Sequence, residues 1–304
     1  MPTSERTPGA FAWLLRVAWL SLALGLSGGI ADLVRSWPSA PRMAAESMAW
    51  VGWTLGLVTL LAPRPLGLTV VRVIAAAALG TAVLAVVSTD AVRSIAGLAS
   101  AGTVAALVAA PETAAWMANG AAYGNERRFP LSHPWVVGWV AGPLAAGFLA
   151  ATTVAGPLLL LHHQTALGLV AVSLAAVLAR PLTRSLHALS TRWAIIVPGG
   201  LVVHDPLTLS NAVLLPRAFI ADIRQDGTPD DESLDLRLGA KIGTLTVILN
   251  EAVSFGVVSR PGRRVELVPT KAVIVSASQP GALLREIAQR GLTRPASTRP
   301  RAGP

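Results

Sequence analysis

The stretch LGLTVVRVIAAAALGTAVLAVV, residues 66–87, decides the fold class, because Arg72 is its single charged residue. A helix needs about 20 mostly apolar residues to cross about 30 Å of hydrocarbon, and this stretch is long enough. We therefore predict that it spans a membrane. Arg72 lies near one end, from which its long side chain can extend the guanidinium to the interface.

Five other stretches have the same character. The whole chain is 53% hydrophobic and only 13% charged, whereas soluble domains carry about 25% charged residues. We predict a membrane-embedded bundle of about six transmembrane helices within residues 1–184. The five further spans are 11–34, 47–61, 94–110, 135–161 and 164–179.

The arginines outside these spans predict the orientation. Cytoplasmic loops carry an excess of basic residues. One predicted face holds Arg6, Arg64, Arg127, Arg128, Arg180 and Arg184, and the other holds Arg35, Arg42 and Arg93. We therefore predict a multi-pass protein of the cell membrane with both termini in the cytoplasm. Residues 111–134 form the longest loop of this block, and we expect them to contact the soluble domain or a partner.

Two features of the composition exclude classes of function. The chain has no cysteine, which rules out disulfides, thiolate metal sites and cysteine nucleophiles. Its formal charge is +9, but the basic residues are dispersed and form no basic helix or aromatic-interleaved patch. We therefore expect no nucleic-acid partner.

Residues 185–291 change to short β-branched runs separated by turns, so we predict a β-rich domain. The expected strands are 193–197, 201–204, 212–215, 218–223, 233–238, 244–249, 252–258, 264–268 and 271–275. One closing helix over 282–290 is expected to have Ser278 as its N-cap and Gly291 just after its end. The segment 226–232 is predicted to be a loop, and the tail 292–304 to be disordered.

Two motifs carry a resemblance to bacterial pleckstrin-homology-like (PH-like) domains. RWAIIVPGGLVVHDPL, residues 192–207, resembles the opening strands of such domains, and IVSASQPGALLREI, residues 274–287, resembles their junction between last strand and helix. The helical part resembles multi-span membrane proteins of high-GC Gram-positive bacteria, for which no activity is established. The resemblance implies a cytoplasmic PH-like domain that serves interaction or assembly, and it supplies no functional residues.

Several short motifs could serve catalysis, metal binding or transport, but their positions in the predicted spans and turns argue against these roles. Residues 25–29, GLSGG, match the nucleophile pattern around Ser27, but the pattern lies in a predicted span and not at a strand-to-helix turn. We expect small-residue helix packing there. His162 and His163 could bind a metal, but we expect a polar turn. Glu112 could serve transport from within the membrane, but we expect it at the interface.

Two further patterns concern packing and surface contact. Gly52 and Gly56, like Gly138 and Gly142, have the spacing of close helix packing. Arg260, Arg263 and Arg264 form a basic turn in the β-rich domain. This turn either contacts anionic lipid headgroups or a partner, or it is only a solvated turn.

The sequence favours a non-enzymatic membrane protein whose soluble domain binds a cytoplasmic or membrane protein, or a lipid surface. A small-solute transporter or permease is the alternative, although residues 11–87 and 94–180 show no clear internal repeat. An intramembrane hydrolase is a third possibility, and the spans are nearly bare of the polar groups that it needs. We expect no catalytic residue, metal site or cofactor.

Overall fold

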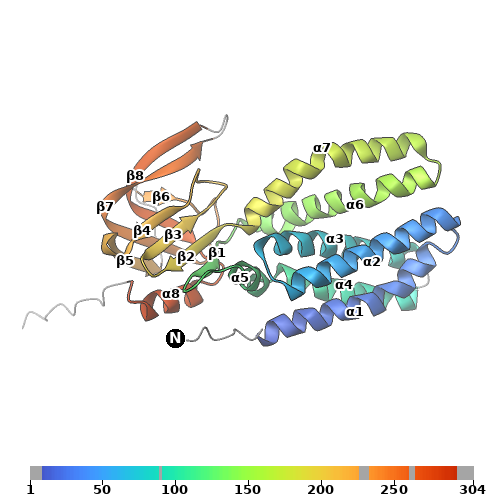
Figure 1. The fold of residues 1–304 in the computed structure, drawn as a ribbon, viewed down its shortest axis with the longest axis horizontal. Coiled ribbons are helices and arrows are strands. Elements are labelled where there is room, and N and C mark those ends of the chain that lie inside the picture. The colour runs from blue at the N-terminus through green and yellow to red at the C-terminus, as the bar shows by residue number, and fades with distance from the viewer. Residues whose placement is uncertain (1–8, 89–90, 226–232, 260–263, 293–304) are drawn as a thin grey trace, which may run out of the picture. The chain divides into compact units, whose positions relative to one another are not determined.

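The computed structural model describes residues 9–88, 91–225, 233–259 and 264–292 (Figure 1). Its contacts divide the chain into two compact units. The helical unit contains residues up to Ala121 together with Val136–Ser190. The β unit contains Ala122–Trp135 and the residues from Thr191 onward.

The helical unit runs back and forth along one axis (Figure 1). Five of its helical segments are long and apolar enough to cross a membrane, and a sixth span arises if α4 and α5, which meet at a bend of 60°, count as one. The prediction of a multi-span membrane protein is confirmed. The elements are α1 (Ala10–Leu33), α2 (Ser39–Leu61), α3 (Pro65–Ser88), α4 (Ala91–Ala109), α5 (Pro111–Asn119), the π-helical turn η1 (Val137–Ala141), α6 (Gly142–Leu161) and α7 (Thr165–Ser190).

Two helices extend beyond the predicted apolar stretches. Helix α2 begins at Ser39 and not at residue 47, and an ion pair between Arg42 and Glu46, one turn apart, supports its polar first turns. Helix α7 continues to Ser190, past Pro181 and past the end of its apolar run at residue 179. The boundary between the units therefore falls after Ser190, whereas the sequence suggested residue 184. Apolar stretches mark the part that suits lipid, and a helix can continue beyond it.

The segment 111–134 is not a loop, which corrects the sequence-based expectation. Pro111 starts α5, at a position where its missing N–H costs nothing. Residues Arg127–Pro130 form strand β1, which pairs antiparallel with β2 (Trp193–Val197). Residues 122–134 of this segment are thus a structural part of the β unit, whereas α5 belongs to the helical unit.

The β unit contains two four-stranded sheets. The first has the order β1-β2-β3-β4 and the second β5-β7-β8-β6, and each is antiparallel except for the parallel pair β6–β8. Buried side chains of both sheets and of helix α8 (Pro280–Gln289) form one core. The other elements are β3 (Gly200–His204), β4 (Val213–Pro216), the 3-10 turn η2 (Arg217–Phe219), β5 (Ile220–Gln225), β6 (Ser233–Asp235), β7 (Thr244–Ser259) and β8 (Arg264–Ser276). The predicted β-rich domain with a closing helix is confirmed.

Several predicted elements differ in detail. Four short strands merge into two long ones, β7 and β8, because a register shift between Ile248 and Val253 accommodates the polar residues that suggested a break. Strand β6 covers only the first three residues of the predicted run 233–238. The prediction of Ser278 as N-cap is wrong, since Gln279 takes that place and the Ser278 hydroxyl donates to the Pro130 carbonyl. Gly291 has a φ of +58°, as expected after a helix end. The predicted loop 226–232 and residues 293–304 of the tail lie outside the described residues.

Candidate functional site

Ser27 lies on an exposed side of α1, where its hydroxyl donates to the Leu24 carbonyl of the same helix at 3.2 Å. The neighbouring glycines provide close packing instead. A Cβ on Gly25 would lie 2.9 Å from Cβ of Ser100, and one on Gly29 would lie 3.2 Å from Cβ of Ala85. The motif GLSGG therefore packs α1 against α3 and α4, as its location in a span indicated.

The two histidines form part of the turn between α6 and α7. His162 ends α6, and its ring makes an edge contact with Trp37 at 4.6 Å between centroids. His163 is exposed and has a φ of +59°. Within the described ranges, no group of three or more His, Cys, Asp or Glu side chains is placed to hold a metal ion.

Glu112 is exposed in the first turn of α5. A carboxylate is favourable there, because the N-terminus of a helix carries a partial positive charge. The side chain therefore lies at the bend between α4 and α5, in line with the expectation that it is not buried in the bundle.

The Gly52–Gly56 pattern serves close packing through Gly56. A Cβ on Gly56 would lie 1.9 Å from the Trp19 ring, which is fully buried. The indole N–H groups of Trp19 and Trp53 donate to each other's backbone carbonyls, both at 3.0 Å. At Gly142, by contrast, the nearest atom to such a Cβ is the carbonyl of Val137 in its own segment, so this glycine does not mark a helix contact.

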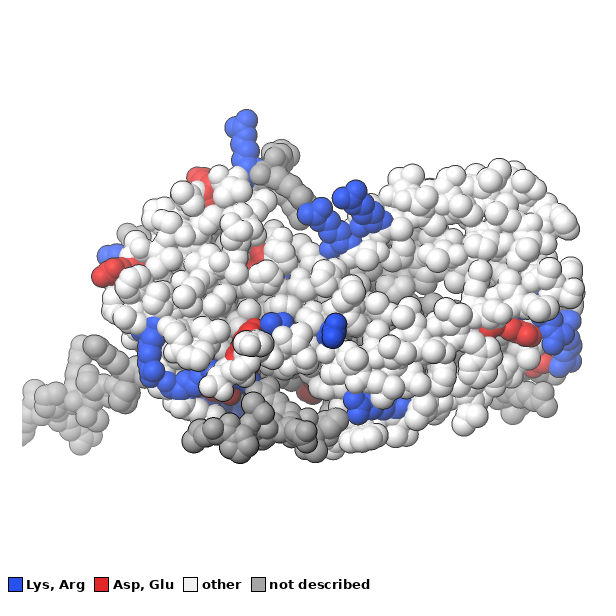
Figure 2. Space-filling model, viewed as in Figure 1, with Lys and Arg blue, Asp and Glu red and all other residues white. Residues whose placement is uncertain are grey.

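Charged side chains of the helical unit gather near its two ends, with uncharged surface between them on the face that Figure 2 shows. Arg16 donates twice to the Leu60 carbonyl in the last turn of α2, at 3.2 and 3.1 Å, and lies over the rings of Trp13 and Trp116. Arg72 donates to the Ser190 hydroxyl in the last turn of α7 at 3.3 Å. Both cations thus lie at helix C-termini, where the helix dipole favours positive charge.

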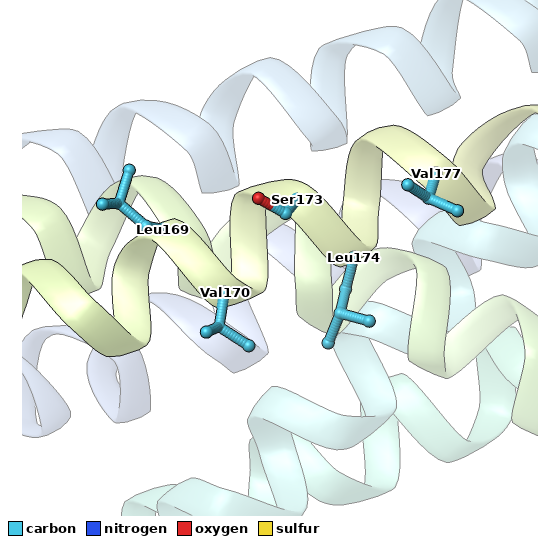
Figure 3. Close-up of a pocket in the computed structure, with 5 residues that line it drawn as sticks. All are labelled: Leu169, Val170, Ser173, Leu174 and Val177. Carbon is cyan, nitrogen blue, oxygen red and sulfur yellow. The ribbon is translucent and has the colours of Figure 1, made fainter.

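The outer side of α7 bears a shallow apolar depression of about 360 Å³. Its lining side chains project from α7 alone (Figure 3): Leu169, Val170, Ser173, Leu174 and Val177. A surface made of leucine and valine with one serine suits lipid acyl chains. It offers no convergent polar groups for a solute.

A buried ion pair organises the β unit. Arg192 and Asp205 are both 1% exposed, and their side chains meet at 2.9 Å. The Arg192 guanidinium also donates to the carbonyls of Ser132 and Leu236, at 2.8 and 2.9 Å. One side chain therefore ties together the segments after β1, β3 and β6. The sequence showed an arginine beside a tryptophan but gave no sign of these partners.

An aromatic cluster extends along the first sheet next to this pair. The Arg128 guanidinium lies 4.9 Å from the centroid of the Trp193 ring, which lies 5.6 Å from the His204 ring. Burial, assisted by the charge of Arg128, holds the pKa of His204 below its usual value, although Asp205 opposes this. Burial tends to raise the pKa of Glu126, but the hydrogen bonds from Arg128 and from Tyr123 N–H, together with the charge of Arg128, outweigh burial and lower this pKa. No nucleophilic side chain lies among these groups. We therefore interpret the cluster as a set of contacts that holds β1 against β2.

The most exposed apolar part of a strand lies on the distal half of the β7–β8 hairpin, residues 253–258 and 265–270, here called the hairpin arm. Leu267 is 71% exposed and Val265 is 55% exposed. Both side chains point to the same side of β8, because side chains alternate along a strand. The residue opposite Leu267 is Gly256, which has no side chain to cover it.

The two edges of the hairpin arm differ. The β7 edge is covered by residues 208–210, through a bridge between Leu209 and Val257 and a bond from Ser210 N–H to the Gly256 carbonyl. On the β8 edge, β6 pairs only with residues 272–274. Among the strands that the structure describes, none pairs with that edge at residues 265–269. The arm thus combines exposed aliphatic side chains with a strand edge that no described strand covers.

Of the three arginines in the predicted basic turn, Arg264 opens β8 and is exposed. Arg260 and Arg263 lie outside the described residues. The sequence directed attention to the charges of this turn but missed the apolar side chains beside it, because Val265 and Leu267 read as an ordinary half-buried strand.

No known family model matches this chain, and neither the curated proteins nor the solved structures contain a detectable match. The function is therefore inferred from the fold and from the exposed surfaces of the described residues.

Proposed function

We propose that this multi-span membrane protein is a non-enzymatic interaction module, in which the helical unit is the anchor and the β unit captures a partner protein. The observation that carries the proposal is that Leu267 and Val265 are exposed beside an edge of β8 that none of the described strands covers. Exposed, apolar strand edges bind further strands, and soluble proteins normally cover or charge them. The cytoplasmic location and PH-like character of the β unit belong to the same proposal.

The partner that fits this edge is an extended peptide segment of another protein. Strand addition uses backbone hydrogen bonds for affinity and alternate side chains for specificity. Here Leu267 and Val265 would contact alternate apolar side chains of the added strand. Arg264, which opens β8, adds positive charge at the end of this edge, so an acidic residue near one end of the peptide is expected.

Site-specific photo-crosslinking in native membranes tests the proposal. A photoreactive residue at position 265 is expected to crosslink to one defined segment of one protein. The same group at Leu214, which is 49% exposed on β4, serves as the control for exposure. Mass spectrometry of the crosslinked peptide should show an extended segment with alternating apolar residues.

Two variants distinguish strand addition from nonspecific hydrophobic binding. Leu267→Pro removes a backbone N–H on this strand, and Leu267→Asp removes the apolar contact, and each should lower the yield at position 265 by at least about tenfold. Leu214→Asp should leave the yield unchanged. Equal crosslinking from positions 265 and 214, or crosslinks to lipid alone, would show that the edge does not bind a strand.

A further inference from the structure

The loop that connects β6 to β7, residues 237–243, presents apolar side chains to solvent. Ile242 is 83% exposed and Leu238 is 43% exposed. Leu238 also has a φ of +55°, a conformation that a branched, bulky residue adopts at a cost. Burial does not explain why a leucine is held there.

The loop is nevertheless well fixed at both ends. At its start, the Leu236 carbonyl accepts a hydrogen bond from Arg192. At its end, the Ile242 carbonyl accepts one from the Ser276 hydroxyl, and the Gly243 carbonyl accepts one from Ala277 N–H at 2.8 Å. The exposed side chains are therefore presented by an anchored turn.

The length of chain between this loop's neighbour Pro134 and the next candidate span limits how far the loop can lie from that span. Within the β unit, the nearest atom to a Cβ built on Gly239 is Cγ of Pro134, at 3.9 Å. The chain continues from Pro134 through Trp135 to Val137, where a membrane span begins. Three residues reach at most roughly 11 Å. Trp135 is itself 71% exposed, as is typical of aromatic residues at the level of the headgroups.

The charges of the loop suit an anionic surface. Arg237 is engaged by Asp235 through two hydrogen bonds, at 2.9 and 2.7 Å. The hydrogen bond from Arg237, which outweighs burial, lowers the pKa of Asp235, so that this pair stays ionised and neutral overall. Lys241 is exposed between the two apolar side chains and is the remaining charge of the loop.

We propose that the 237–243 loop inserts Leu238 and Ile242 into the interface of the bilayer that holds the protein's own spans, with Lys241 on anionic headgroups. The apolar side chains gain burial in the acyl boundary, and the lysine gains attraction to the surface charge. This contact orients the β unit on the membrane and is independent of strand binding by the hairpin arm.

The absence of native cysteine makes a direct test possible. In the full chain, reconstituted into vesicles with roughly 30% anionic lipid, Ile242→Cys carries an environment-sensitive fluorophore as the only thiol label. Nitroxide lipids should quench this probe at least about twofold, since side chains of such loops enter the headgroup boundary. A label at Leu267→Cys, a leucine of similar exposure on the hairpin arm, should stay accessible to an aqueous quencher.

The variant Lys241→Glu in the Ile242→Cys background should reduce the lipid quenching in anionic vesicles to its level in zwitterionic ones. Equal access of the aqueous quencher to both labels would overturn the proposal. Shielding of position 242 in native membranes but not in vesicles would also overturn it, because it would point to a protein contact. Failure at position 242 would leave the crosslinking result at position 265 untouched, so the two proposals can be told apart.

Discussion

At the scale of single residues, the β unit depends on a charge that water cannot reach. The Arg192 guanidinium makes three hydrogen bonds although the residue is only 1% exposed, and its partners come from three separate segments. The sequence predicted the strand that Arg192 precedes. It could not predict the partners, because carbonyls such as those of Ser132 and Leu236 leave no signature in side-chain type.

Asp205→Asn should destabilise the β unit by about 3–5 kcal/mol, because it leaves the Arg192 charge buried without a counter-charge. The double variant Arg192→Met, Asp205→Leu should be less harmful, since it removes both charges. Hydrogen exchange at β2 and β3 in the full chain in micelles measures the free energy of opening.

The matched control is Arg224→Met, which breaks an exposed pair with Asp222 and should cost less than about 1 kcal/mol. A cost for Asp205→Asn that is no larger than this would mean that the buried pair contributes only packing.

At the scale of elements, the apolar stretches predicted which segments form spans but not where the helices end. Lipid demands a minimum apolar length, and polar turns such as those at Ser39 and Ser190 continue the helix at no cost in water. Likewise the sequence predicts a break within β7, because the polar residues before Val253 resemble a turn. The GxxxG spacing did find one true contact, at Gly56.

Gly56→Ala should destabilise the helical unit by about 1–3 kcal/mol, because the added methyl group overlaps the buried Trp19 ring, which must move. Thermal unfolding in detergent, followed by helical circular dichroism, measures the effect. Gly80→Ala in α3 is the control, since no atom lies within 4 Å of its added Cβ.

The control should be neutral or stabilising by up to about 1 kcal/mol, as alanine is the better helix former. If both variants behaved alike, the Trp19 contact would not limit the packing of α1 on α2.

At the scale of the whole molecule, the pairing of β1 with β2 restricts the topology. These strands lie on either side of α6 and α7 in the chain, so both must be on the same side of the membrane. Helices α6 and α7 must then cross as a pair. The sequence suggested the bundle and the β-rich region, but not β1, because RRFP has no alternating β-branched pattern and its partner strand is distant.

Single cysteines test this topology. His163→Cys, in the turn between α6 and α7, should react with a membrane-impermeant maleimide on intact cells. Tyr123→Cys, at a residue that is 90% exposed in the β unit, should react only after permeabilisation. The reverse pattern would invert the predicted orientation. Reaction at both sites on intact cells would contradict the paired crossing of α6 and α7.

The early position of β1 in the chain also determines the order of folding events during synthesis. Ser132 leaves the ribosome 60 residues before Arg192, which hydrogen-bonds its carbonyl. At about 5–20 residues per second this interval lasts several seconds, during which α6 and α7 must enter the bilayer. Strand β1 (Arg127–Pro130) has to stay unpaired until that insertion is complete. Pairing of β1 with β2 can therefore occur only after α6 and α7 have both inserted with the correct orientation. If α6 and α7 are misplaced, β2 has no β1 to pair with and remains an exposed edge strand. Such a chain should be degraded by quality-control proteases.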